Sequence, residues 1–599
     1  MAKLIILSII LFVVVAAATI PNEDGPTELV ENNNNWNMPD NIKIVTTPPF
    51  DSYFVQTHKL PPQGLQWTLK GKTSELHLIG DRETLLMIQP KPTATYGFNS
   101  PPTVQITCTI DNKEYSVVLT TNPPDQLPPT EAKQPPIATN AYSVRITREF
   151  VRPGMKVVVN DDVTQVIMPK VGMDGTLRQF NVPFYLFGAT DATIPIGNTK
   201  ADPARKAAIF QTWPVANLEV IDHPMERLSW DSIVMLPANN NPAYKIFGAS
   251  SMKDGYDLMN TVLPFLKALQ TTSGEVNTNQ LYYSPLIALN IPNGNFSGTG
   301  GGLGGGTVGA GDHVYSGIFI HEMGHAMGLP HAGEAYNDGQ YPYVNGSLKG
   351  SVVGFDMDHN EFLDIYISPN ATDFFNCQKR SVMFNGKCVR QDPMQSGSGA
   401  QSKGYPFSLF SDFNMAGFQL YLEGNTTINS KGEHVPNGKI VYRPNRNIYE
   451  QWDTISLAYV QVKVATASKG LYGQLNLGLP TKRDVDIYTI FMQHNSAPTS
   501  TCVNCSIIYP LSKKYKGNLV DYIDPTNATQ LATITPNTGD IPWYCHSYGC
   551  DYTMRVTYDD GSLYIKVLAK GVRGWFKPTD VPHPNYSNPL SSDILNEIV

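Results

Sequence analysis

Alternating apolar and polar residues predict β-rich regions before and after the middle of the chain. Every second residue from Val104 to Ile110 is apolar, Asp111-Asn112 can form a turn, and Tyr115 to Leu119 runs back. Because side chains of a strand point alternately to its two faces, we expect a β-hairpin here. Met554 to Tyr558 and Leu563 to Leu568 predict a second hairpin near the C-terminal end.

The middle of the chain combines helical and strand patterns. Apolar residues at helical spacing predict an amphipathic helix over Lys253 to Leu269, and Leu281 to Ile291 is typical of a buried strand. A second helix is expected over Val314 to Met327. Gly328 can take the left-handed conformation that ends a helix, and Pro330 prevents its resumption. The predicted fold class is therefore α+β, flanked by β-rich, sandwich-like N- and C-terminal regions.

At 599 residues the chain is too long for one compact core. The repeated proline pairs between residues 122 and 140 indicate a stiff, extended linker. The expected division is residues 1–18 as signal peptide, 19–45 as a polar, Asn-rich segment, 46–121 as a β-rich domain, 122–140 as the Pro-rich linker, 141–427 as the α+β domain and 428–599 as a β-rich C-terminal region.

The first residues have the order of a secretory signal peptide. Lys3 is followed by an apolar run from Leu4 to Val15 and then by Ala16-Ala17-Ala18, with cleavage expected after Ala18. The alternative is a signal anchor, but the run is shorter than the ~20 residues of a typical membrane span. We therefore expect a secreted, extracellular protein without stable membrane insertion. The oligomeric state does not follow from the sequence.

The composition of the chain agrees with secretion. Acceptor triplets for N-glycosylation begin at Asn295, Asn345, Asn370, Asn425, Asn504, Asn527 and Asn585. The net charge of −8, with 16% charged residues, argues against nucleic acid or an anionic membrane as the main partner.

The cysteines favour disulfides in an exported protein. Cys377 and Cys388 are a plausible pair. Two disulfides are the preferred interpretation of Cys502, Cys505, Cys545 and Cys550, with a zinc knuckle that includes His546 as the alternative. Cys108 lies on the apolar face of the first hairpin, which favours a buried free thiol over a distant disulfide partner.

The strongest chemical pattern is H-E-x-x-H-x-x-G-x-x-H. It is filled by His321, Glu322, His325, Gly328 and His331. His321 and His325 stand one turn apart on a helix and can bind one ion from the same side, and His331 returns after Gly328 as a third ligand. Three imidazoles leave one position of a Zn²⁺ ion open for water, as in a catalytic site. We expect one catalytic zinc, with Glu322 as the general base of peptide hydrolysis.

Two other segments have weaker chemical signals. The glycine-rich stretch from Ser297 to Asp312 lacks the Lys of a phosphate-binding loop, so it better suits the close approach of an extended peptide. Asp356 to Asn360 resembles the start of a calcium loop. However, Glu361 replaces the required glycine and Ile367 the bidentate glutamate, which argues against calcium.

The extended histidine motif resembles that of the metzincin clan of zinc endopeptidases. This resemblance implies a tight turn with a methionine beneath the metal. Asp392-Pro393-Met394 is the best match, so Met394 is the candidate for this Met-turn. Met383 is the runner-up, and the alternative is that the methionine simply fills the core.

Within that clan, the chain resembles the dictomallein group, which is related to the StcE-type secreted metalloproteases that cut heavily O-glycosylated proteins. The similarity is carried by the glycine-rich segment, the H-E-x-G-H-x-x-G-x-x-H helix, the Cys377 and Cys388 pair, and Asp392-x-Met394. It is strong over roughly Val157 to Asn425 and departs from astacin-like patterns in having Ser396 two residues beyond Met394, so no transition-state tyrosine is named.

The resemblance implies a metzincin-type domain acting on an extended polypeptide, with glycosylated polypeptides among the expected substrates. The mucin preference of the bacterial relatives need not carry over, because their additional binding modules are not recognisable here. One rival is a secreted glycan-binding or adhesion protein with an inactive protease-like domain. Another is a zinc-dependent amidase or deacetylase. The intact histidine and glutamate set counts against an inactive domain.

Overall fold

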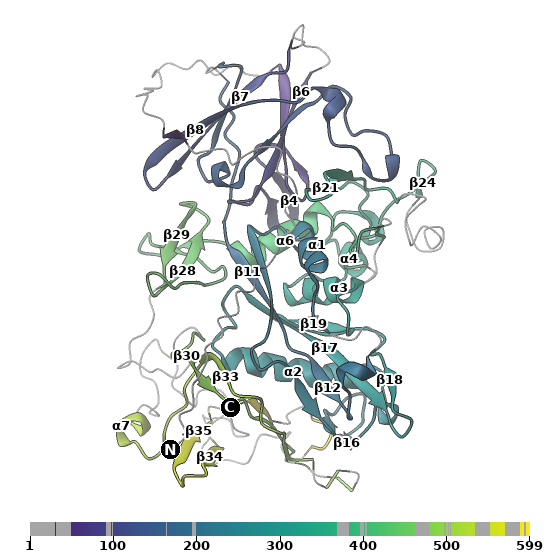
Figure 1. Ribbon diagram of the computed structural model, residues 1–599, viewed down its shortest axis with the longest axis vertical. Helices are drawn as coiled ribbons and strands as arrows, with labels where there is room; N and C mark the ends of the chain where they lie inside the picture. The colour runs from purple at the N-terminus through teal and green to yellow at the C-terminus, as the bar shows by residue number, and fades with distance from the viewer. Residues whose placement is uncertain are drawn as a thin grey trace, which may run out of the picture.

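The computed structural model describes most of residues 49–568. The described residues are 30–31, 49–91, 98, 100–162, 165–194, 199–367, 383–395, 400–401, 404–462, 478–495, 497, 499–500, 502–503, 505–532, 551–568, 588–591 and 595–598. The expected signal peptide and most of the Asn-rich segment lie outside them. In Figure 1 the N-terminal strands form the top of the molecule, the helices lie near its middle and the C-terminal strands lie at the lower left.

Two four-stranded sheets form the N-terminal region. One has the order β1-β8-β7-β10 and the other β3-β2-β6-β9. The strands are β1 (Val30–Glu31), β2 (Phe50–Val55), β3 (Lys59–Leu60), β6 (Thr84–Pro90), β7 (Thr103–Ile110), β8 (Lys113–Thr120), β9 (Tyr142–Ile146) and β10 (Lys156–Val159). The hairpin predicted from the alternating pattern is confirmed as β7 and β8, and apolar residues of both sheets share one core.

The boundary expected at residue 141 differs from the observed one. β9 pairs with β6, and β10 pairs with β7, so the N-terminal sheets extend to Val159. The Pro-rich segment carries the chain from β8 in one sheet to β9 in the other, and it is packed where Glu131 is buried. Because prolines favour an extended backbone, this segment can cross from one sheet to the other. It therefore connects two sheets within the N-terminal region.

A mixed sheet forms the centre of the molecule around the buried strand β17 (Gln280–Asn290). β17 pairs in parallel with three strands and antiparallel with β18, and β19 is antiparallel to β20 at the edge. The other strands of this sheet are β11 (Thr176–Asn181), β12 (Phe184–Leu186), β13 (Asn217–Asp222), β14 (Leu228–Trp230), β18 (Asn295–Ser297), β19 (Leu303–Gly305) and β20 (Val308–Gly311). A strand covered on both faces explains the nearly continuous apolar run of β17.

Helices cover both faces of this sheet. They are α1 (Pro203–Thr212), α2 (Asp257–Thr272) and α3 (Gly317–Ala326). The other described helices are α4 (Ala332–Asn337), α6 (Asp412–Glu423), which packs against β5 and β28, and α7 (Ala528–Leu531). Tyr283 of β17 packs against Phe319 of α3 at 4.9 Å between ring centroids, whereas Val308 of β20 belongs to the core on the α2 side. α2 begins later than predicted because the Asp257 carboxylate accepts the Asp254 main-chain N–H in the preceding turn.

Shorter strands complete the N-terminal and central parts of the described chain. They are β4 (Leu65–Leu69), β5 (Lys72–Leu76), β15 (Ile233–Met235), β16 (Tyr244–Ile246), β21 (Gly354–Asp356), β22 (Glu361–Leu363), β23 (Met383–Phe384), β24 (Lys387–Cys388), β25 (Thr427–Ile428) and β26 (His434–Val435).

The C-terminal region packs against the central sheet. Tyr509 stacks on Trp230 with 3.9 Å between ring centroids, and Phe491 lies against Phe265 of α2. Its strands are β27 (Val441–Arg443), β28 (Ile448–Asp453), β29 (Ala458–Gln461), β30 (Lys482–Ile487), β31 (Phe491–His494), β32 (Ile507–Ile508), β33 (Tyr515–Leu519), β34 (Thr553–Thr557), β35 (Leu563–Val567) and β36 (Leu595–Ile598). β34 and β35 confirm the second predicted hairpin. The molecule is therefore mixed and strand-rich.

Four of the seven cysteines lie among the described residues. Cys108 is a buried free thiol, as predicted. Cys502 and Cys505 form a disulfide, and Cys388 is disulfide-bonded. Cys377, Cys545 and Cys550 lie outside the described residues. Among the helices that the structure describes, none is long and apolar enough to cross a membrane.

Candidate active site

Helix α3 places two histidines on one face. It begins at Gly317, three residues later than predicted, because the Ser316 hydroxyl accepts the Ile318 main-chain N–H at 3.1 Å and caps the helix. His321 and His325 follow one turn apart, with 4.7 Å between their ring centroids. Both rings therefore face the same point beside the helix.

Gly328 ends the helix and reverses the direction of the chain. Its φ of +89° lies in the left-handed region that favours glycine. The Gly328 N–H donates to the His325 carbonyl at 2.9 Å, and the Leu329 N–H donates to the Gly324 carbonyl at 3.0 Å. These two bonds define a Schellman motif, which satisfies the last carbonyls of the helix. His331 follows at the start of α4, with its ring 4.7 Å from that of His325.

The three histidines form a group that could hold a metal ion. One nitrogen from each lies within 4.8 Å of the others, and the Nε2 atoms of His321 and His325 are 3.1 Å apart. The Nδ1 atom of His321 lies 2.7 Å from the Pro393 carbonyl, and that of His325 lies 2.7 Å from the Leu329 carbonyl. Because a carbonyl only accepts, each Nδ1 carries the proton, which leaves the Nε2 lone pairs free for the ion.

His331 lies near a carboxylate. Its Nδ1 atom is 3.4 Å from Glu334 Oε2, one turn further along α4, and both side chains are exposed. His321 and His325 thus each have an acceptor at Nδ1, and His331 adds one ring nitrogen to the group. This donor set fits a zinc ion, which prefers neutral imidazole nitrogen. Burial lowers the pKa of His321 to about 4, with the neighbouring histidines adding to the effect, and burial also lowers the pKa of His325.

Glu322 lies directly beside this group. It is 6% exposed, and burial raises the pKa of its carboxyl to about 7. The glycine-rich segment covers it. A Cβ atom on Gly302 would lie 2.6 Å from Glu322 Oε1, and one on Gly304 would overlap the Glu322 main-chain carbonyl. Gly302 therefore lies against this carboxylate, and Gly304 of β19, an edge strand of the central sheet, lies against the Glu322 main chain.

Met394 lies beneath the same helix. It is fully buried, and a Cβ atom on Gly324 would overlap its sulfur. Asp392 holds the turn, because its two carboxylate oxygens accept the main-chain N–H groups of Met394 and Ser411, each at 2.8 Å. Met383, the other candidate, is 51% exposed in β23. The structure thus brings Met394 to the histidines and leaves Met383 on the surface, while the role of Met394 stays a prediction.

Sequence reasoning did not find the groups that orient the histidines. The Pro393 and Leu329 carbonyls are main-chain atoms and leave no residue-type signal. Glu334 stands three residues after His331, at helical spacing, so its carboxylate could have been proposed as a partner. In the sequence, Asp392 is recognisable only as part of the methionine motif.

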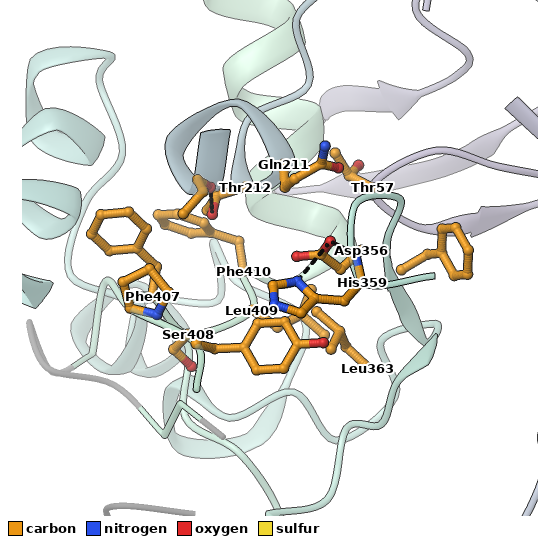
Figure 2. A pocket seen from close by; sticks show the side chains of 14 residues that line it. Thr57, Gln211, Thr212, Asp356, His359, Leu363, Phe407, Ser408, Leu409 and Phe410 are labelled. Carbon is orange, nitrogen blue, oxygen red and sulfur yellow. Dashed lines mark hydrogen bonds and ion pairs between the residues drawn. The ribbon is translucent and has the colours of Figure 1, made fainter. Parts of the chain in front are cut away.

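The calcium-like segment forms a small cavity instead (Figure 2). The Asp356 carboxylate accepts the His359 main-chain N–H at 2.9 Å and lies 3.2 Å from the His359 ring nitrogen. Gln211 and Thr57 face the same cavity of about 40 Å³. Since Asp356 already has these partners within the chain, its contacts give no support to a calcium ion.

Replacing Gly328 with Ala is expected to weaken metal binding. An alanine at this φ costs about 1–2 kcal/mol, and relief of that strain would shift the turn that carries His331. We expect the apparent zinc affinity to fall roughly 5- to 30-fold in a competition titration with a chromogenic chelator. Gly154→Ala is the matched control, since Gly154 has a φ of +83° in the N-terminal region. An unchanged affinity in Gly328→Ala would contradict the role given to this turn.

The central mixed sheet and the three-histidine group define a candidate metal-dependent hydrolase. The family model for peptidase M66 matches residues 131–427. Dictomallein-3 of Dictyostelium discoideum is 40% identical over 557 residues, which cover 91% of this chain and 89% of the relative. Dictomallein of Burkholderia pseudomallei (strain 668) is 38% identical over 556 residues, 90% of this chain and 76% of the relative.

The chain therefore belongs to the dictomallein family of M66 peptidases, and the resemblance inferred from its motifs is confirmed. By family it is a peptidase that acts on polypeptides. M66 peptidases are metalloproteases, and the three histidines are the group of the described residues that could hold a metal ion.

Proposed function

We propose that this protein is a secreted zinc endopeptidase of the metzincin type. The observation that carries the proposal is the convergence of one ring nitrogen from each of three histidines, two of them with Nδ1 bonded to a main-chain carbonyl, next to the buried carboxylate of Glu322. The H-E-x-x-H-x-x-G-x-x-H pattern with a methionine turn below it supports the metzincin assignment. His321, His325 and His331 are the proposed ligands.

The chain's own residues divide the chemistry between them. A zinc ion at this site, when bound, would polarise the scissile carbonyl and activate a water molecule as the nucleophile. Glu322 accepts the proton of the attacking water and returns it to the nitrogen of the leaving amine. The glycine-rich segment packs over the Glu322 carboxylate and limits the access of bulk water to it. The Pro393 and Leu329 carbonyls hold the orientations of the His321 and His325 rings.

The glycine-rich edge supports an extended polypeptide as substrate. Among the described strands, β19 is paired with β20 alone, and it contacts Glu322. A substrate chain can add to its other side through main-chain hydrogen bonds, which places the scissile bond near the histidines. A glycosylated substrate is proposed because the family is related to proteases of glycoproteins, and export rests on the N-terminal charge and apolar pattern.

Removal of the metal tests whether the protein is a metal-dependent peptidase. Purified protein is incubated with casein and with a mucin-type glycoprotein, with and without a chelator, and cleavage is followed by electrophoresis. We expect cleavage of at least one substrate, its loss with chelator, and its return after addition of zinc. Absence of cleavage by zinc-loaded protein would favour the rivals, an inactive glycan-binding protein or an enzyme acting on another bond.

A further inference from the structure

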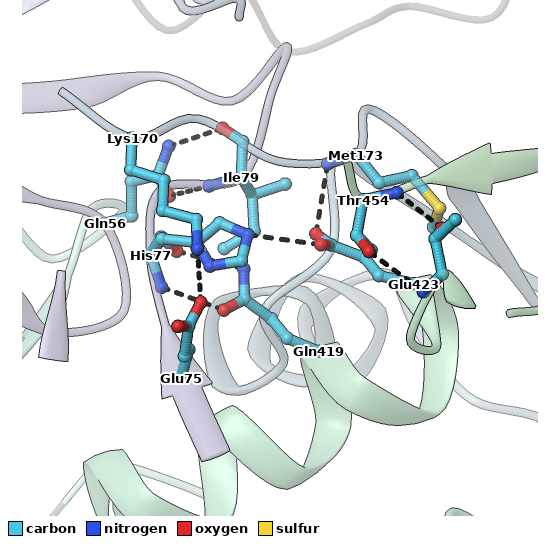
Figure 3. Close-up of polar contacts among 10 residues, drawn as sticks. Gln56, Glu75, His77, Ile79, Lys170, Met173, Gln419, Glu423 and Thr454 are labelled. Carbon is cyan, nitrogen blue, oxygen red and sulfur yellow. Dashed lines mark hydrogen bonds and ion pairs between the residues drawn. The ribbon is translucent and has the colours of Figure 1, made fainter. Parts of the chain in front are cut away.

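A polar cavity lies where three parts of the chain meet, away from the histidine group (Figure 3). Its volume is about 330 Å³. Glu75 and His77 come from the end of the β4–β5 hairpin, Glu423 and Asn425 come from the end of α6, and Thr454 follows β28. In Figure 3, His77 lies above Glu75 and Gln419, with Glu423 and Thr454 to its right. The cavity therefore joins the N-terminal, central and C-terminal regions.

One buried polar atom at this cavity has no partner. The side chain of His77 is 9% exposed, and its Nε2 atom lies 3.1 Å from Glu423 Oε2. Its Nδ1 atom is buried without a hydrogen bond. Gln419 fixes the position of the residue, since its amide bonds both the main-chain N–H and the carbonyl of His77. Because Nδ1 is enclosed by the protein, the polar groups open to the cavity come from the neighbouring lining residues, among them Glu75, Lys170 and Thr454.

The charges around the cavity favour a neutral ligand. Lys170 forms an ion pair with Glu75, and Glu423 is engaged by His77 and by the Met173 main-chain N–H at 3.0 Å. A cation or an anion would therefore meet charges that are already paired. Carboxylate, ammonium and hydroxyl groups on one wall can together bond several hydroxyls of one molecule. The volume lies at the low end for small-molecule sites, which suits one or two sugar units.

Asn425 places a sugar acceptor on the wall of this cavity. It is exposed and begins the acceptor triplet Asn425-Thr426-Thr427. Gly424, with a φ of +66°, ends α6 and turns the chain, and the Asn425 main-chain N–H donates to Asn437 Oδ1 at 2.7 Å. The acceptor at Asn527 differs, because its side-chain oxygen caps α7 by accepting the Thr529 and Gln530 N–H groups.

We propose that Asn425 carries an N-linked glycan whose first sugars occupy this cavity. The modification forms a bond between Asn425 Nδ2 and C1 of the sugar. It breaks the bond from C1 to the pyrophosphate of a lipid-linked oligosaccharide, and the amide proton leaves with the lipid pyrophosphate. The sugar hydroxyls and N-acetyl group then bond to Glu75 and Lys170 in the wall of the cavity. This inference rests on the export part of the proposed function and is independent of the peptidase chemistry.

Release of the glycan from the folded protein tests the inference. The full chain is secreted from a eukaryotic host, and each acceptor is followed by peptide mapping while peptide-N-glycosidase acts in ¹⁸O-labelled water. We expect Asn425 to be modified and its glycan to be released about tenfold more slowly than that of Asn527, because hydrogen bonds hold it in the cavity. After denaturation the two rates should be equal.

Variants of the cavity identify the contacts. Glu75→Gln and Lys170→Met should each raise the release rate at Asn425 and leave Asn527 unchanged. The matched controls are Glu226→Gln and Lys513→Met, which alter an exposed ion pair outside the cavity. Equal rates at the two acceptors, or rates unaffected by both cavity variants, would overturn the inference. A secreted chain in which Asn425 is unmodified overturns the inference and leaves export standing, whereas a chain that the host retains inside the cell overturns both.

Discussion

Replacing Glu322 with Gln is expected to lower the rate of peptide hydrolysis roughly 10²- to 10⁴-fold. Glutamine keeps the size of the side chain under Gly302 and Gly304, so the fold and the contact with β19 should be preserved. It removes the oxygen that accepts the proton of the attacking water. The three imidazoles and their acceptors are untouched, so the protein should still bind one zinc ion.

Two measurements distinguish this result from a loss of metal or of fold. Zinc content is determined by elemental analysis, and initial rates are measured on a fluorogenic peptide under the same conditions. Glu433→Gln, a change in an exposed turn after α6, serves as the control and should retain full activity. Turnover near the wild-type rate in zinc-loaded Glu322→Gln would contradict the general-base assignment.

Removing Glu131 is expected to have the largest effect on stability. Its carboxylate pairs with the guanidinium of Arg390, and the two side chains are 1% and 2% exposed. The same oxygen accepts the Asp364 main-chain N–H at 3.0 Å, and Arg390 Nε donates to the Asp364 carbonyl at 2.7 Å. Glu131→Ala leaves a guanidinium buried without its carboxylate, which typically costs about 3–5 kcal/mol.

Denaturant unfolding of the full chain, followed by tryptophan fluorescence, measures that cost. Glu226→Ala is the control, because the Glu226 and Lys513 side chains are 67% and 64% exposed and their ion pair should contribute nothing measurable. Replacing both members of the buried pair with methionine should recover part of the loss. If the free energy of unfolding of Glu131→Ala differs from that of the wild type by less than about 1 kcal/mol, the ion pair does not stabilise the contact between its two segments.

The local parts of the site could be predicted from the sequence, and the long-range parts could not. The helix, the one-turn spacing of His321 and His325, and the reversal at Gly328 depend on residues within one or two turns of each other. The pairing of Glu131 with Arg390 joins positions 259 residues apart. The Pro393 carbonyl reaches His321 across 72 residues, as a main-chain atom that any residue could supply.

The same distinction explains the fold. Hairpins such as β7–β8 follow from alternation and a turn, both of which are local. The extension of the N-terminal sheets to Val159 depends instead on β9 and β10 pairing with strands far back in the chain. Proline pairs indicated an extended crossing, but they could not tell a linker between domains from a crossing between sheets. Likewise, apolar patterning could not show that Tyr509 stacks on Trp230.

The contacts of residues 392–395 with the histidine segment affect when the site forms during synthesis. The Met394 carbonyl accepts the Ala332 main-chain N–H at 3.2 Å, and the Pro393 carbonyl orients His321. A nascent chain that ends before Asp392 already contains all three histidines and Glu322, yet it lacks both acceptors and the buried methionine. A ribosome must therefore translate well past the histidines before the site is complete, which delays proteolytic competence until most of the catalytic region has been made.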